Sequence, residues 1–133
     1  MTLRRWISVA AGTAAVGLAA TTAPVLAHHS AAEAYDSSKT VEAQGTITKV
    51  LFKNPHAFVF LESTDEKGQK IEWQVELGAS TSMFNAGWTK EMLMPGMVVK
   101  VTGNPSRAPG SHGLTSAKFT KADGSPIGPR TTQ

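Results

Sequence analysis

The stretch from residue 41 to residue 77, VEAQGTITKVLFKNPHAFVFLESTDEKGQKIEWQVEL, decides the fold. It contains three runs rich in β-forming residues, 41–52, 56–63 and 71–77, which two turn-forming segments separate. Apolar and polar residues alternate strictly in the third run, which predicts a strand with one buried and one wet face. The second run is apolar on both faces, so we expect a central strand there. Gly45 interrupts the first run, which predicts a bulge or a sharp bend.

The chain after residue 77 completes a small barrel. We expect a short helix over 79–86, a single turn over 90–93 and two further strands over 97–103 and 114–121. Five short strands, a bulged first strand and a helix between strands 3 and 4 match the element order of an OB-type barrel. We therefore predict a mainly β protein, a small five-stranded OB-like β-barrel, with a β-sandwich as the alternative.

The first 27 residues have the pattern of a signal peptide. Arg4 and Arg5 precede an apolar, alanine-rich segment, and Pro24 is followed by the small and apolar residues expected before a cleavage site. We predict cleavage between Ala27 and His28; cleavage after Ala23 and a retained membrane anchor are the alternatives. The predicted organisation is a signal peptide over 1–27, an N-terminal arm over 28–40, the barrel over 41–124 and a flexible tail over 125–133.

Export and composition restrict the possible partners. We expect a periplasmic or secreted product without stable membrane insertion after cleavage, and the pattern leaves open whether the Sec or the twin-arginine route exports it. The chain has no cysteine, which excludes disulfides, thiolate metal sites and a lipid anchor at the cleavage point. Without the signal peptide, 11 Lys and Arg face 10 Asp and Glu, a net charge of +1. That balance argues against nucleic-acid binding.

The sequence contains no phosphate-binding loop, nucleophile elbow or metalloprotease helix. Glu72 and Glu76 fall on the wet face of the third strand, where solubility is the simplest role. Nothing in the pattern marks either carboxylate as a tuned acid or base. We therefore leave enzymatic activity open and favour a protein without it.

The four histidines carry the one sharp functional hypothesis. Cleavage after Ala27 would give His28 a free α-amine beside its ring Nδ1, and these two nitrogens can chelate one ion in a histidine brace. Amine and imidazole ligands suit Cu(II). His29, His56 or His112 could supply a third nitrogen, and His56 is the best candidate because it follows a proline turn at the start of a strand. The predicted metal residues are therefore His28, His29 and His56, with copper as the possible cofactor.

Two other groups of residues have a packing interpretation and a functional one. Met92, Met94 and Met97 could offer thioethers to Cu(I), but methionine commonly fills gaps in a core, and we favour packing. Aromatic residues on an OB face could stack on a ligand. Alternation favours core packing for Trp73 and for Phe58 or Phe60, and Trp88 is expected to plug one end of the barrel.

An ordered set of short motifs resembles a known family. The motifs are His28-His29-Ser30, Tyr35-Asp36 with Lys39, Gly45-Thr46-Ile47-Thr48-Lys49-Val50, Asn54-Pro55-His56, Glu76-Leu77-Gly78, Gly87-Trp88-Thr89 and Pro95-Gly96. Together they resemble the bacterial exported family catalogued as domain of unknown function 6152. The resemblance implies an exported small β domain, an OB-type barrel by the same strand order, with no assigned activity. His28, His29 and His56 fall on its signature positions.

Three functions fit these observations. The one we favour is a non-enzymatic module that binds a small ligand or a periplasmic protein partner through the barrel. The second is a copper or other transition-metal protein that uses His28 with His29 or His56. The third is a copper-dependent redox enzyme built on the same residues, for which the sequence shows no substrate cleft.

Overall fold

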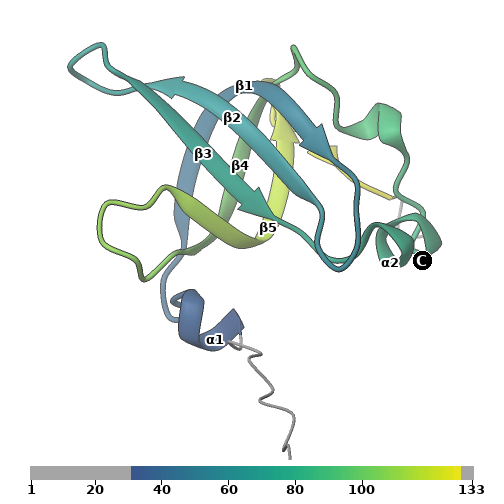
Figure 1. The fold of residues 1–133 in the computed structure, drawn as a ribbon. Coiled ribbons are helices and arrows are strands. Elements are labelled where there is room, and N and C mark those ends of the chain that lie inside the picture. Colours follow the sequence, from purple (N-terminus) through teal and green to yellow (C-terminus); the bar gives the residue numbers. More distant parts are fainter. Residues whose placement is uncertain (1–30, 130–133) are drawn as a thin grey trace, which may run out of the picture.

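The computed structural model describes residues 31–129 (Figure 1). Its elements are α1 (Ala31–Ala34), β1 (Val41–Leu51), β2 (Phe58–Thr64), β3 (Lys70–Glu76), α2 (Ser80–Asn85), the 3-10 helix η1 (Lys90–Met92), β4 (Val98–Pro105), β5 (Gly113–Lys121) and β6 (Pro126–Ile127). All helical elements are short. Within residues 31–129, none of them has the length and apolar character needed to cross a membrane.

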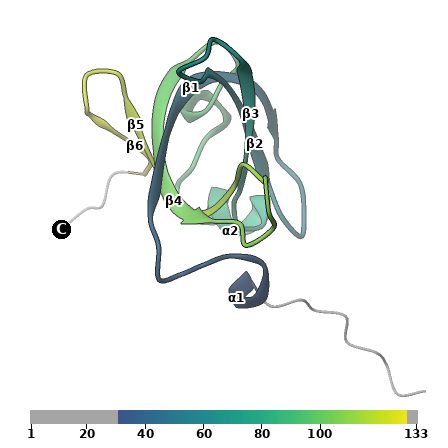
Figure 2. The same ribbon diagram turned by 90° about the vertical axis from the view of Figure 1, so that its left-hand side faces the viewer.

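The strands form one sheet that closes on itself. Their order is β3-β2-β1-β4-β5-β6, and β3 also pairs with β5. The β3–β5 pairing is parallel, and the other pairings are antiparallel. Figure 2 shows the strands arranged around a common interior. The closed five-stranded barrel, with α2 between β3 and β4, confirms the predicted OB-like fold and excludes the β-sandwich.

Alternation along the strands builds the core. β2 lies between β1 and β3, as its two apolar faces predicted. Val59 and Leu61 are fully buried, whereas Phe58 and Phe60 lie half-buried on the opposite face with ring centroids 6.5 Å apart. The largest fully buried side chains are Ile47, Leu61, Leu93, Leu114, Val59, Val75, Val99 and Val101. Burial of each contributes about 1.5–3 kcal/mol, which makes this cluster the main source of stability.

Gly45 permits a close approach between strands. A Cβ at this position would collide with the backbone oxygen of Glu62 on β2. The register shift in the β1–β2 pairing lies between Ile47 and Lys49, so the expected irregularity is present in β1 but not at the glycine itself. The glycine is therefore required by the packing of two backbones.

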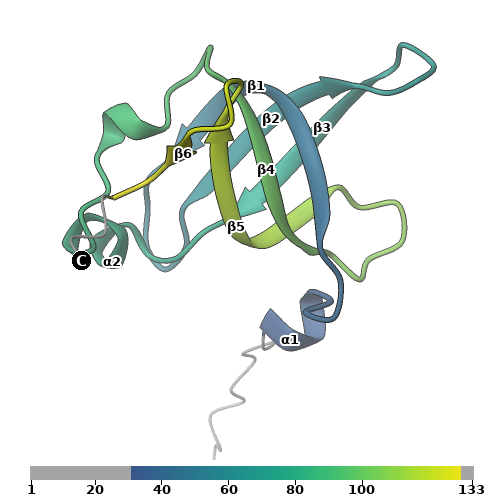
Figure 3. The same cartoon turned by 180° about the vertical axis from the view of Figure 1, so that it is seen from behind.

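The predicted tail begins with an ordered strand. Pro126–Ile127 form β6, which pairs with Thr120 and Phe119 of β5 (Figure 3). Ile127 is 8% exposed and belongs to the core. The expectation of a flexible tail from residue 125 is therefore wrong at its start, because a two-residue strand is too short to produce a hydrophobic period.

Replacement of Gly45 by alanine should destabilise the barrel. The added Cβ forces β1 away from β2, and overpacking of this kind costs about 1–3 kcal/mol. Gly78→Ala is a matched control, because a Cβ there has nothing within 4 Å. Guanidinium unfolding followed by circular dichroism measures both. Equal free energies of unfolding for the two variants would show that the close approach is not a constraint.

Candidate functional site

His56 lies just before β2, at the end of a turn that is tied to its surroundings. The backbone N–H of Ala57 donates to Gly78 at 3.0 Å, and that of Leu77 donates to Ala57 at 2.9 Å. Asn54 in the same turn accepts hydrogen bonds from the backbone and the hydroxyl of Thr81 at 3.3 and 3.2 Å. The side chain of His56 remains 51% exposed. A fixed backbone thus presents an accessible imidazole.

Glu76, the last residue of β3, holds the His56 ring. Nδ1 of His56 lies 3.0 Å from Oε1 of Glu76. The other carboxylate oxygen, Oε2, accepts a hydrogen bond of 2.6 Å from the hydroxyl of Tyr35. Sequence reasoning assigned Glu76 to a wet face with no role beyond solubility. That interpretation is wrong, because the side chain is only 24% exposed and has a partner on each oxygen.

The hydroxyl of Tyr35 is a hydrogen-bond donor in this cluster. Burial raises the pKa of its hydroxyl well above the usual value, and the hydrogen bond to Glu76 and the negative charge of that residue raise it further. The phenol therefore stays protonated at neutral pH and donates to the carboxylate. Sequence reasoning named Tyr35 within the motif Tyr35-Asp36 but assigned it no role, although its place in that motif was the available signal.

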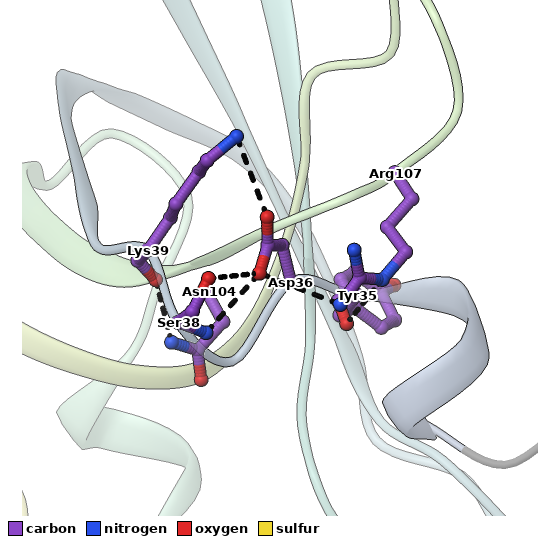
Figure 4. A network of polar contacts seen from close by, with 6 residues as sticks. All are labelled: Tyr35, Asp36, Ser38, Lys39, Asn104 and Arg107. Carbon is purple, nitrogen blue, oxygen red and sulfur yellow. Dashed lines mark hydrogen bonds and ion pairs between the residues drawn. The ribbon is translucent and has the colours of Figure 1, made fainter.

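The backbone around Tyr35 is anchored on the end of β4 and on the segment that follows it (Figure 4). The Asp36 N–H donates to the carbonyl of Pro105 at 2.8 Å, and Nε of Arg107 donates to the carbonyl of Tyr35 at 3.2 Å. Asp36 accepts a hydrogen bond of 2.6 Å from the Ser38 hydroxyl, which is the main reason that its pKa lies below the usual value. The C-terminal half of the predicted arm is thus docked on the barrel.

A cavity of about 400 Å³ opens beside His56 and Glu76. It lies where the end of β3, the start of β5, α2 and the segment after α2 meet. Its lining residues are His56, Glu76, Leu77, Gly78, Met83, Trp88, Thr115, Ser116 and Ala117. The walls are mainly apolar, with a few polar groups from the His56–Glu76 side and from β5. The volume lies within the range of small-molecule sites, and the cavity is open to solvent.

Ser116 has an unusual backbone in this lining. Its φ is +52°, the only positive φ of a residue other than glycine among residues 31–129. It lies at the bulge in β5, opposite Gly103, where a Cβ would come within 2.6 Å of the Thr115 carbonyl oxygen. A residue other than glycine whose backbone adopts the left-handed region raises the free energy of the folded state, and such residues cluster at functional sites. Sequence reasoning missed Ser116, because a bulge in a polar strand leaves no periodic signal.

Of the predicted metal residues, the structure describes only His56. His28, His29 and the cleavage site between Ala27 and His28 lie outside the described residues. His56 lies at the cavity, whereas the ring of His112 packs edge-on against Trp73 with centroids 5.1 Å apart. Among residues 31–129, no group of three or more His, Asp or Glu side chains could hold a metal ion. Whether His28 and His29 could complete a metal site with His56 stays a prediction.

Met92, Met97 and Trp88 follow the packing interpretation, whereas Met94 does not. Met92 and Met97 are partly buried against the core, and Met94 is 46% exposed. The Met97 sulfur accepts a hydrogen bond of 3.2 Å from the Met94 N–H. Trp88 is also partly buried against the core and forms part of the cavity wall.

The lone tyrosine allows the cluster to be tested spectroscopically. Tyrosinate absorbance reports Tyr35 alone, because the chain has one tyrosine. The midpoint of its titration should lie above 10.0, the ordinary pKa of a tyrosine. The folded state binds the Tyr35 proton more tightly than the unfolded chain. The contribution of this proton to the free energy of unfolding is therefore complete below pH 10.0, and it is lost as the pH rises further toward the raised pKa of the folded state. Glu76→Gln removes the charge and should lower the midpoint, whereas Glu72→Gln on the same strand should leave it unchanged. An ordinary midpoint in the unmodified protein would contradict the hydrogen bond.

Comparison with known proteins identifies the family. The model of a family of unknown function, DUF6152, matches residues 14–116, which is most of the chain. This region includes β1 to β4 and the residues of the Tyr35–Glu76–His56 cluster. No curated protein matches the chain. The match confirms the resemblance of the ordered motifs, and the chain belongs to the DUF6152 family.

Proposed function

We propose that the protein is an exported, periplasmic binding module without enzymatic activity, and that its ligand occupies the cavity beside His56. The observation that carries this proposal is an apolar cavity of about 400 Å³ with a fixed histidine–carboxylate pair at its side. Leu77, Met83 and Trp88 offer apolar contact area. Cavities with this division between apolar walls and a few polar groups bind small organic molecules.

The hydrogen bonds at His56 restrict the ligand. Nδ1 faces the Glu76 carboxylate, so in a neutral ring the Nδ1–H donates a hydrogen bond to that carboxylate and Nε2 is left as an acceptor. The cavity also offers the hydroxyls of Thr115 and Ser116. We therefore infer a ligand with an apolar body and a hydrogen-bond donor, such as a hydroxyl or an amide, that reaches Nε2.

Benzyl alcohol is a suitable probe of this proposal. Titration of the mature, isotope-labelled protein should shift amide resonances of residues 76–78 and 115–117, and His56→Ala should weaken binding about fivefold, the effect of one lost hydrogen bond of about 1 kcal/mol. His112→Ala is the matched control and should bind like the unmodified protein. Benzyl methyl ether lacks the donor and should bind His56→Ala and the unmodified protein alike. Resonance shifts confined to other surfaces would exclude the cavity.

A specific observation favours a second function, the binding of copper or another transition metal. Metal-binding histidines commonly donate their second nitrogen to a carboxylate, and Glu76 holds His56 in that way. Nε2 of His56 is then available as a ligand. His28 would add its α-amine and Nδ1, and His29 a further imidazole, a nitrogen set that suits Cu(II). Tyr35 brings the arm that follows these histidines to the same carboxylate.

Copper titration distinguishes this function from the first. Mature protein that begins with His28 should bind one Cu(II) with an electron paramagnetic resonance spectrum of several nitrogen ligands. One extra residue before His28 blocks the α-amine chelate and should weaken binding at least tenfold, as should His56→Ala, whereas His112→Ala should not. A mature protein with another N-terminus, or without a multi-nitrogen signal, would exclude the site. Turnover with a reductant and oxygen or peroxide would instead indicate a copper-dependent redox enzyme.

A further inference from the structure

One edge of β5 changes its partner along the length of the strand. The opposite edge pairs with β4 over residues 114–121, with one bulge. The edge in question pairs with β3 at residues 113 and 114 and with β6 at residues 119 and 120 (Figure 3). Between these two pairings, no strand of residues 31–129 pairs with residues 115–118 on this side. We call this stretch the open edge of β5.

The chain is anchored at both ends of the open edge. After β3, the Leu77 N–H donates to the Ala57 carbonyl at 2.9 Å, so the chain continues beside the start of β2. After β6, Gly128 lies against the indole of Trp88, because a Cβ on Gly128 would be 3.5 Å from Cζ2 of that ring. Neither segment follows β5 into the interval, which spans about 13 Å if four residues are extended.

The cavity beside His56 lies along the open edge. Residues 115–117 of β5 and residues 76–78 at the end of β3 both line it, and Met83 and Trp88 belong to its apolar wall. A ligand in the cavity therefore contacts the edge of a strand as well as side chains.

The bulge adds backbone groups that β4 does not pair. Gly103 of β4 alone lies opposite two residues of β5, Ser116 and Ala117. The extra residue of such a bulge is left unpaired by the partner strand. Its N–H and C=O groups need another partner, either water or a ligand. A strand edge of this kind is a template for the addition of an extended peptide.

An extended peptide matches both parts of the cavity. Its backbone repeats N–H donors and C=O acceptors at the spacing of the open edge. Every second side chain points to the same face of a strand. An apolar side chain of the peptide can therefore contact the wall of Leu77, Met83 and Trp88 while the backbone pairs with β5.

We propose that the ligand of the cavity is an extended peptide segment of another protein that pairs with the open edge of β5; this inference rests on the cavity-binding function proposed above. The segment continues the sheet across the interval between β3 and β6. The hydrogen-bond donor that reaches Nε2 of His56 is then an N–H group of the peptide. Recognition comes from the backbone of the peptide and from one apolar side chain, rather than from a single functional group.

Two N-methylated peptides of equal composition test the inference. The probe is acetyl-Thr-Leu-Thr-Leu-Thr-amide, titrated into the isotope-labelled protein. One analogue carries N-methyl groups on both leucines, and the other carries them on the second and third threonines. Alternate N–H groups of a strand face opposite edges, so only one analogue loses the hydrogen bonds to β5. That analogue should bind at least about tenfold more weakly, the effect of two lost hydrogen bonds, and the other should stay within about twofold.

The resonances locate the peptide on the protein. The unmethylated probe should shift the amides of residues 115–118, and exchange of the Ser116 or the Ala117 amide proton with solvent should slow at least about tenfold. Two analogues that bind alike, or shifts confined to other surfaces, would overturn the inference. Binding of benzyl alcohol without binding of the peptide would also overturn it and leave the cavity function standing. Absence of binding by either compound would overturn the cavity function itself.

Discussion

Closure of the barrel by β3 and β5 is the constraint on which the rest of the molecule depends. Only a parallel pairing at Gln74–Gly113 and Val75–Leu114 joins these two strands, yet it turns an open sheet into a barrel. It also brings the end of β3 beside the start of β5, where the Thr115 hydroxyl donates to the Glu76 carbonyl at 3.4 Å. The cavity, the carboxylate and the docking place of the arm all lie at this junction.

The sequence predicted the architecture well because the information for it is local. Alternation in 71–77, two apolar faces in β2 and a proline-glycine turn before β4 are short-range patterns, and the succession of elements they give matches that of an OB-type barrel. The site is different. Glu76 is identical in pattern to Glu72, and only contacts with residues 20 and 41 positions away distinguish the two. His56 was singled out because it follows a proline turn at the start of a strand, and its predicted metal role stays a prediction. Tyr35 appears only in the motif Tyr35-Asp36, which assigns it no chemistry, and Ser116 belongs to no motif.

The chemistry of the site follows from the same junction. A histidine whose Nδ1 side is held by a carboxylate presents one basic nitrogen in a fixed direction. An organic donor group and a metal ion both require such a nitrogen, so both proposed functions use the same residue. They differ in where the remaining contacts come from. An organic ligand would take them from the apolar wall of the cavity, and a metal would take them from the N-terminal histidines.

The shortness of the β3–β5 pairing has a consequence for local opening of the barrel. β2 and β3 pair over seven residues, whereas β3 and β5 pair over two. Local opening of a protein begins where the fewest backbone hydrogen bonds must break. The residues that follow this pairing on the two chain segments, 76–78 and 115–117, line the cavity. Among the five strands of the barrel, we therefore expect β3 and β5 to separate most readily, next to the cavity wall.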